Sequence, residues 1–564
     1  MTGRRLFGVE TEYAVTAVKG DGTVIPAMEL ATAIQRAAER MLPSLPGSCE
    51  AGLFLGNGSR LYVDAGAHPE IASPECLDPW DIVRYLRAGD RMLQRLAEDV
   101  RSRNSVLKEA RLFTGNVDYS GTGSTWGSHE SYCHRVDPGL LRRRLVPHLV
   151  SRVIFSGAGG FNPRSRGLEF TLSPRAHHLN HVVSDNSTHD RGITHTRYEP
   201  LARPGYHRQH LICGESLRSD MATWLRVGTT ALVVAMIDGG VACGDEVELR
   251  MPVEALRVVA NDPTCECLVQ LRRGGTATAI EVQRHYLAHA RAHVHESFMP
   301  SWAGDVCERW GGILDRLAAG PDRVSATLDW AIKLTIYRDR VRRRGFNWES
   351  LPVWSRALDA LERARRTGKG PFPALTSALL HTDDRLRVQA EALAPMLRDV
   401  GCAWAQLDAV LTLRRELFEV DMRWGLLGSG SLFEQLDRAG VLDHHVAGVE
   451  RIDEAAEQPP AEGRARARGM AIQRLWRQRD RYSCGWDHVW DVMGTSSLDL
   501  SDPWTEVEEW RTRHVARQDP RPEPTAAQAA PPATDEASIM EEIHRLLSRA
   551  RPGARRPRPA DPSA

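Results

Sequence analysis

Residues 6–15 read LFGVETEYAV, and this stretch carries the first fold prediction. Successive side chains of a β-strand point to opposite faces of a sheet, so an extended segment here places Glu10 and Glu12 on the same face. The residues between and around them, which are mostly apolar, then occupy the other face. The sequence therefore predicts a strand whose polar face carries two carboxylates.

Two further runs, residues 60–64 (RLYVD) and 168–173 (LEFTLS), alternate in the same way. Their polar positions are Arg60, Tyr62 and Asp64 in the first run and Glu169, Thr171 and Ser173 in the second. Three strands that each have one polar face predict a sheet packed on one side and lining a wet cavity on the other.

An ordinary amphipathic sheet that faces solvent would show the same alternation, but its exposed face favours Lys, Thr and Ser. Here carboxylates dominate, and His68, Pro69 and Glu70 follow soon after Asp64. Crowded carboxylates repel one another unless cations intervene, and hard oxygen ligands suit Mg²⁺. Because Mg²⁺ retains phosphate oxygens in its coordination shell, we expect ATP as its companion.

Cationic donors for a phosphate occur in the middle of the chain. Arg191, Arg197 and Arg208 lie close in sequence to three histidines, of which His210 is the last. The sequence contains no GxxxxGK[ST] loop and no kinase or Rossmann signature, so a phosphate cradle of backbone amides is not expected.

Composition limits the class of protein. The 564 residues include 73 Lys+Arg and 73 Asp+Glu, so no global positive field attracts nucleic acid or an anionic membrane. The most apolar run, residues 230–237, is far shorter than the ~20 residues of a membrane-spanning helix. Ten cysteines without a CxxC pair predict reduced thiols, and Glu10 and Glu12 interrupt any signal-peptide core. We therefore expect a cytoplasmic protein that has neither nucleic acid nor membrane as a partner.

The organisation along the chain predicts an α+β fold. Short alternating runs and turns up to about residue 240 indicate an antiparallel sheet, with helices at 27–41, at 79–100 and from an N-cap at Ser219 to the glycines at 239–240. We expect the main domain in 1–346, an Arg-rich helical insertion in 347–413, and the rest of the main domain with a small C-terminal domain in 414–515. Residues 516–564 are expected to be a disordered Pro/Ala-rich tail with a possible helix at 537–550.

Three strings resemble one known family. They are GVETEY at residues 8–13, RLYVDAGAHPEIASPEC at 60–76 and GSTWGSHESY at 123–132. Together they are similar to the Pup ligases and to their sister enzymes, the Pup deamidases or depupylases. The resemblance implies a glutamine synthetase-like fold, in which a curved antiparallel sheet with packed helices holds ATP and Mg²⁺.

The resemblance also assigns roles to residues at matching positions. Glu10, Tyr62 and Glu70 match Mg²⁺ ligands of the family, and Asp64 matches its catalytic base. Arg60, Ser73 and Trp486 match its ATP contacts. To these sets we add Glu12 and His210 as candidate metal ligands and Arg197 and Arg208 as candidate nucleotide contacts.

The implied activity is ATP-dependent ligation of the C-terminal glutamate of a Pup-like modifier to a lysine of a protein substrate, through a glutamyl phosphate. The ETEY string and the spacing from Asp64 to His68 favour the ligase, whereas YVD and GSH resemble the hydrolase. A depupylase or deamidase therefore remains the first alternative. A nucleotide-binding regulator without turnover is the second.

Overall fold

The computed structural model describes residues 3–47, 52–64, 66–119, 123–165, 168–186, 190–197, 201–351 and 404–512. The chain divides into one unit, Met1–Arg513, and a second, His514–Ala564, which lies outside these residues. Most of the predicted insertion and the whole predicted tail, including the possible helix at 537–550, also lie outside them. The boundary expected at residue 413 falls within helix α14 (Trp404–Gly425).

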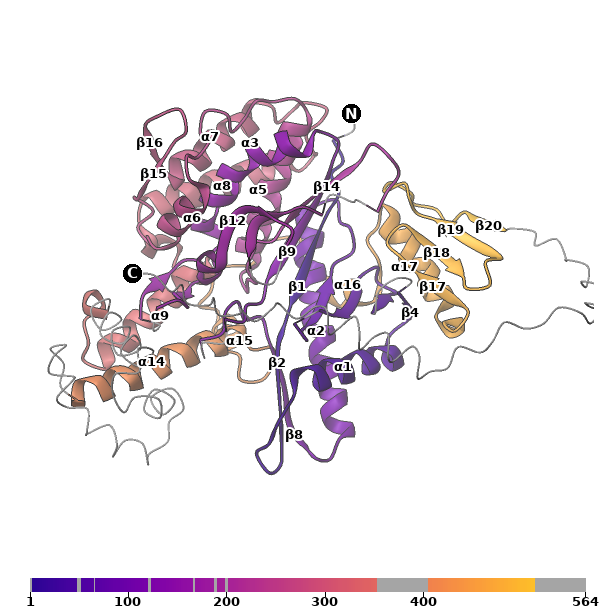
Figure 1. Ribbon diagram of the computed structural model, residues 1–564, viewed down its shortest axis with the longest axis horizontal. Helices are drawn as coiled ribbons and strands as arrows, with labels where there is room; N and C mark the ends of the chain where they lie inside the picture. The colour runs from indigo at the N-terminus through magenta and orange to yellow at the C-terminus, as the bar shows by residue number, and fades with distance from the viewer. Residues whose placement is uncertain are drawn as a thin grey trace, which may run out of the picture. The chain divides into compact units, whose positions relative to one another are not determined.

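A nine-stranded sheet forms the centre of the fold (Figure 1). Neighbouring strands are antiparallel, as predicted, except that β12 and β13 pair in parallel. In spatial order the strands are β12 (Leu179–Ser184), β13 (Arg191–His195), β14 (His207–Leu211), β9 (Ser128–His134), β1 (Phe7–Glu12), β7 (Pro69–Ala72), β6 (Arg60–Val63), β5 (Leu53–Leu55) and β4 (Ser44–Pro46).

The predicted strand at 6–15 is two strands in two different sheets. In β1, buried residues alternate with part-exposed ones, and Glu10 and Glu12 share a face as expected. The chain then leaves this sheet, and β2 (Ala14–Lys19) pairs with β3 (Val24–Ile25) and β8 (Leu107–Phe113). The change of sheet occurs at Tyr13, whose buried hydroxyl donates to Asp90 Oδ1 at 2.8 Å.

The third predicted strand does not line the cavity, and this expectation was wrong. Only Phe170–Thr171 is extended, as β11, and it pairs with β10 (Gly160–Phe161) in a separate sheet. Ser173 caps the 3-10 helix η1 (Pro174–His178), and the buried Thr171 hydroxyl donates to the carbonyl of Ala260. A serine before a proline is a helix-start signal, and this signal outweighs the alternation.

The predicted helices are confirmed in α1 (Ala27–Met41), α2 (Pro79–Arg103) and α5 (Asp220–Asp238). Side-chain caps begin two of them, because Asp78 accepts from Asp81 N and Ser219 from Ala222 N. By length and composition α5 could cross a membrane, but 94% of the apolar window is buried inside the protein.

The later part of the chain is mostly helical, as predicted. Helices α3 (Pro138–Ser151) and α4 (Val153–Ser156) precede α5 in the chain. The described elements that follow α5 include α6 (Pro252–Ala260), β15 (Leu268–Gln270), β16 (Thr276–Thr278), α7 (Ala279–Ala292), α8 (Ala303–Ala318), η2 (Pro321–Val324), α9 (Asp329–Arg343), η3 (Trp348–Ser350), α15 (Leu432–Arg438) and α16 (Ile452–Glu457). Helices α2, α3, α5, α7 and α8 contribute to a core that also contains Phe7 and Val9 of β1. One face of β1 is therefore packed, and the other carries the carboxylates.

The described part of the chain ends in a small sheet, drawn in yellow in Figure 1, which lies beside α17 (Arg464–Leu475) and η4 (Trp476–Gln478). Its strands are β17 (Tyr482–Cys484), β18 (His488–Asp491), β19 (Ser496–Asp499) and β20 (Trp510–Thr512). This sheet and α17 share a core with Leu45 and Phe54 of the N-terminal region. The packing brings Trp486 close to the large sheet.

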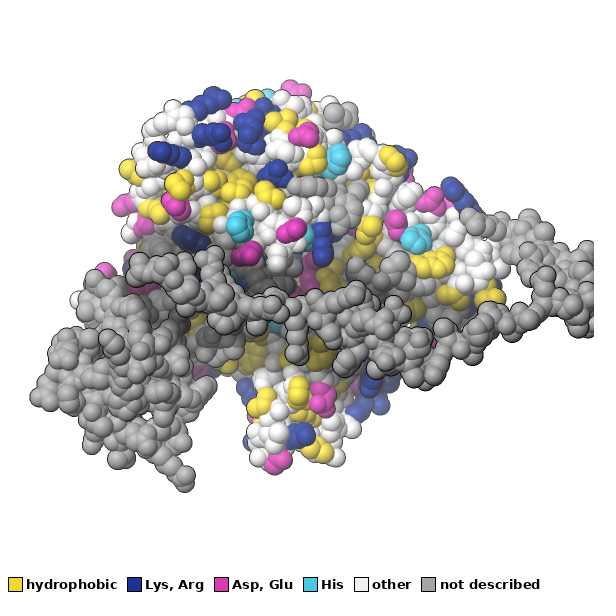
Figure 2. Space-filling view, in the orientation of Figure 1, with side chains coloured by type: hydrophobic (Ala, Val, Ile, Leu, Met, Phe, Trp, Pro, Cys, Tyr) yellow, Lys and Arg dark blue, Asp and Glu magenta, His cyan; other side chains and the backbone are white. Residues whose placement is uncertain are grey.

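Charged side chains of both signs are interspersed over the described part of the face in Figure 2. The balanced composition is thus reflected on this surface, where neither sign forms a continuous patch among the described residues.

Candidate functional site

Strand register places the polar residues side by side. Tyr62 on β6 is opposite Glu70 on β7, and Glu70 is opposite Glu12 on β1. On its other side β1 pairs with β9, which places Glu10 opposite His129. Residues more than 50 positions apart in the sequence therefore meet on one face of the sheet, because adjacent strands hold equivalent positions within about 5 Å.

These side chains line a hollow of about 1130 Å³, which we call the basin. Most of the residues in its wall have polar side chains, and they include carboxylates, histidines and arginines. The lining residues are Glu10, Glu12, Arg60, Tyr62, Val63, Asp64, Gly66, His68, Glu70, Thr125, His129, Arg175, Arg191, His195, Arg197, His210 and Ile212.

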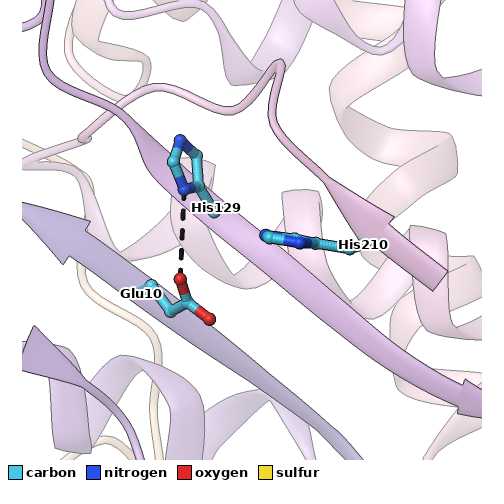
Figure 3. Close-up of side chains that lie close together, drawn as sticks. All are labelled: Glu10, His129 and His210. Atoms are coloured by element: carbon cyan, nitrogen blue, oxygen red, sulfur yellow. Dashed lines mark ion pairs between the residues drawn. The ribbon is translucent and has the colours of Figure 1, made fainter. Parts of the chain in front are cut away.

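Three of these residues converge where Figure 3 shows Glu10, His129 and His210. His129 Nδ1 lies 4.0 Å from Glu10 Oε2, and the two histidine rings are 5.8 Å apart between centroids. Both ring nitrogens of His210 are buried without a hydrogen-bond partner among the described residues. Burial lowers the pKa of His129 to about 3, with a further contribution from Arg175, so this ring is neutral at physiological pH.

Burial and mutual repulsion disfavour the charged forms of the carboxylic acids on this face of the sheet. Burial, followed by the charges of Glu10 and Glu12, raises the pKa of Glu70 well above its usual range. Burial also raises the pKa of Glu12, although its carboxylate accepts a hydrogen bond from Gly127 N at 2.6 Å. The Tyr62 hydroxyl donates to Glu10 Oε2 at 3.4 Å. Buried like charges are stabilised by a cation, and oxygen ligands beside unpartnered imidazole nitrogens fit a divalent ion.

Asp64 lies directly after β6 at the edge of the basin. Its Oδ1 accepts from the backbone N–H of His68 at 2.7 Å, and its Oδ2 lies 3.1 Å from His68 Nδ1. The turn between them contains Ala67 at φ 66°, a left-handed conformation that non-glycine residues seldom adopt. The turn fixes the orientation of the Asp64 carboxylate, which a base in proton transfer requires.

A second hollow of about 690 Å³ adjoins the basin, and Glu10 lines both. Its wall is more apolar and includes Val9, Ala72, Leu201 and Pro503. Ser73, Arg208 and Trp486 also line it, so the three predicted contacts from distant parts of the chain do meet. The Ser73 hydroxyl already accepts from Val9 N at 3.1 Å and donates to Pro74 O at 2.8 Å.

Trp486 is held in this wall by residues of α17 and β5. The Arg468 guanidinium lies 4.8 Å from the Trp486 ring centroid and donates to its carbonyl at 3.1 Å. The Phe54 ring meets the indole edge to face at 5.2 Å. An indole fixed in this way offers a flat apolar surface of the kind on which a nucleobase stacks.

All sequence-predicted site residues lie in these two hollows. Arg60, Asp64 and Arg197 line the basin with the candidate metal ligands Glu10, Glu12, Tyr62, Glu70 and His210. The roles assigned to them stay predictions. Sequence reasoning gave no role to His129 or Arg175, although both line the basin. The alternation in the GSHESY string could have indicated His129, whereas Arg175 comes from η1 and carries no periodic signal.

The fold and the two joined hollows define a class of protein. A mainly antiparallel sheet whose polar face collects carboxylates and arginines beside a second, more apolar hollow fits the glutamine synthetase-like scaffold predicted from the sequence. The model of the Pup-ligase protein family matches residues 5–377 and 399–490. The chain belongs to this family.

Relatives of both activities occur among similar proteins. A Pup–protein ligase of Brachybacterium faecium is 38% identical over 359 residues, which cover 61% of this chain and 73% of the relative. A depupylase of Acidothermus cellulolyticus is 38% identical over 311 residues, which cover 53% of this chain and 60% of that protein.

Two solved structures share the fold. The complex between the prokaryotic ubiquitin-like protein Pup and its ligase PafA superposes with a TM-score of 0.68 at 24% identity and covers 90% of both chains. The Pup ligase PafA in complex with ADP gives a TM-score of 0.62 at 23% identity, covering 86% of this chain and 92% of the other. These likenesses confirm the predicted glutamine synthetase-like α+β architecture.

Proposed function

We propose that this protein is an ATP-dependent Pup–protein ligase, which joins the side-chain carboxylate of a modifier's C-terminal glutamate to a lysine of a protein substrate. The observation that carries the proposal is that the second hollow and the basin meet at Glu10. A nucleoside in the apolar hollow would direct its phosphates past Glu10 into the basin. Family membership supports the same activity.

The basin suits the formation of a glutamyl phosphate. The modifier's carboxylate attacks the γ-phosphorus of ATP, the bond to the β-phosphate oxygen breaks, and ADP leaves. Arg60, Arg191 and Arg197 line the basin and are placed to stabilise the charge on the transferred phosphoryl group. Bound Mg²⁺ would supply further neutralisation, and Glu10, Tyr62 and Glu70, with Glu12 and His210 nearby, are the residues that would hold it.

The second half of the reaction needs a base, and we assign this role to Asp64. The lysine ammonium must lose a proton before its nitrogen attacks the acyl carbon and displaces phosphate. Asp64 is oriented by His68, and its side chain is 20% exposed, so an incoming lysine could approach it. Asp64 would contribute mainly by being held in a fixed position beside the reacting nitrogen.

A depupylase is the second candidate, favoured by the depupylase of Acidothermus cellulolyticus at 38% identity. In that reaction Asp64 would act in hydrolysis of the isopeptide bond or of a C-terminal glutamine amide. The same hollows serve both reactions, so kinetics must separate them. For either activity, ligase or depupylase, we propose that the protein is cytoplasmic.

The decisive experiment incubates the purified protein with ATP, Mg²⁺, a Pup-like modifier ending in glutamate and a lysine-bearing protein. ADP release together with a conjugate supports the ligase. Loss of a preformed conjugate without new conjugate supports the depupylase, and nucleotide binding with neither reaction supports a regulator. Asp64→Asn should slow product formation strongly, whereas Glu169→Gln, outside both hollows, should not.

A further inference from the structure

Two adjacent histidines, His444 and His445, lie between two aspartates outside both hollows. Asp220 is the first residue of α5, and Asp437 lies near the end of α15. The two imidazole rings are 4.1 Å apart between centroids, and in both rings Nδ1 faces Asp220 while Nε2 faces Asp437. His444 is buried, whereas the side chain of His445 is 65% exposed.

Hydrogen bonds define which ring nitrogens can bind a ligand. Asp437 Oδ1 lies 3.1 Å from His444 Nε2 and 3.0 Å from His445 Nε2, so it accepts from both when these nitrogens carry the protons. The backbone N–H of Asp220 points at His444 Nδ1 at 3.3 Å, which identifies that nitrogen as an acceptor. The Nδ1 atoms of both rings therefore face Asp220, where His445 Nδ1 is hydrogen-bonded to Asp220 Oδ2 at 3.3 Å, and a metal ion bound here would replace this bond and the one from the Asp220 N–H.

The three facing atoms have the spacing of a metal site. His445 Nδ1 lies 3.3 Å and His444 Nδ1 lies 3.8 Å from Asp220 Oδ2. Ligands bound to tetrahedral Zn²⁺ at about 2.0–2.1 Å are separated by about 3.3 Å. Asp437 then acts as the carboxylate behind the histidines, which in zinc sites fixes the tautomer and the ring orientation.

The surrounding charges favour a cation. Arg87 pairs with the other Asp220 oxygen at 2.8 Å and leaves Oδ2 facing the histidines. Asp90, Glu434 and Asp329 surround Arg87 and Arg218, so the acids outnumber these two arginines. The positive end of the α5 dipole opposes a cation, and the Asp220 carboxylate offsets this effect.

We propose that Asp220, His444 and His445 bind one Zn²⁺, or another divalent metal that prefers nitrogen ligands, with water on the exposed side of His445. Such an ion fastens the segment after α15 to α5. The same segment contacts α2, where Trp80 Nε1 donates to Ala447 O and Arg84 to Gly448 O, each at 2.8 Å. The site is structural and separate from ATP chemistry.

The test titrates Zn²⁺ into the chelator-treated full-length protein against a chromophoric competitor, in the presence of excess Mg²⁺. His445→Ala is the test variant, because its exposed ring can be removed without opening the core. His488→Ala is the matched control, since His488 is a part-exposed histidine paired with Asp487 elsewhere. His210→Ala removes one of the two histidines of the basin cluster.

We expect the wild type, His488→Ala and His210→Ala to share a Zn²⁺ equivalent that binds at least 100-fold more weakly in His445→Ala. Co²⁺ should give the visible absorption of a tetrahedral site, and Zn²⁺ should raise the melting temperature of all but His445→Ala. Equal binding by His445→Ala and wild type, loss of the equivalent in His210→Ala alone, or no binding by the wild type would overturn the proposal.

Discussion

Replacing Glu75 by glutamine tests how the α17 segment is fastened beside the nucleotide hollow. The Glu75 carboxylate accepts from Arg464 Nε at 2.7 Å and from Arg468 Nη1 at 3.2 Å, and it forms a further ion pair with Arg468 Nη2. Only 13% of its side chain is exposed, and Arg468 is fully buried. Arg468 also holds the carbonyls of Gly58 and Trp486. The variant keeps the shape but leaves two buried guanidinium groups without their anion.

The magnitude follows from the pKa of Glu75. Burial by itself raises this pKa, but Arg468 and Arg464 outweigh burial and lower it from 4.5 to about 2. At about 1.4 kcal/mol for each pH unit, this lowering corresponds to about 3 kcal/mol of stability at pH 7. Because the folded-state pKa is depressed, the stabilisation is complete above pH 4.5 and is lost as pH falls from 4.5 toward 2. It should decrease by about 1 kcal/mol between pH 7 and pH 4.

Chemical denaturation of the wild type and Glu75→Gln at pH 7 and pH 4 measures both quantities. Glu462→Gln is the matched control, since Glu462 pairs with Arg4 at an exposed position and should cost about 0–1 kcal/mol. Glu75→Gln should also weaken nucleotide binding through Trp486. A cost below about 0.5 kcal/mol at pH 7, or a difference from wild type that stays constant with pH, would refute the reasoning.

Three further predictions concern the two hollows. Asp64→Asn should slow conjugate formation by about 10²–10⁴-fold while the Kd for ADP changes little, as single-turnover kinetics and calorimetry can check. Trp486→Ala should raise the Kd for ADP by roughly 5- to 150-fold, the equivalent of about 1–3 kcal/mol of base stacking, and an unchanged Kd would remove the indole from the nucleotide site. Because the pKa of Glu70 is raised, protons should compete with Mn²⁺ or Mg²⁺ at pH values above 4.5, so the metal affinity of the wild type should weaken progressively on acidification. In Glu70→Gln, metal binding should be weaker and should depend less on pH. Identical pH profiles for the two proteins would contradict this role of Glu70.

The local sequence pattern was sufficient to predict those helices and strand faces that are set by the residues within the element itself. The alternation in β1 and β6 correctly placed Glu10 and Glu12, and Arg60 and Tyr62, toward the cavity. The helix predicted at 79–100 from its periodicity is observed as α2, and Ser219 was correctly identified as a cap. The same alternation failed at residues 168–173, because Ser173 and Pro174 begin a 3-10 helix there.

The sequence by itself determined the class of fold, the polar faces of two central strands and, through its resemblance to the Pup ligases, the family. Only the tertiary structure decided that His129 and Arg175 join the basin and that Asp220 meets His444 and His445. The physical reason is that strand register and the packing of α17 and α15 arise from contacts between distant segments. A local pattern fixes the face on which a side chain lies, but it does not identify the neighbour that the side chain meets.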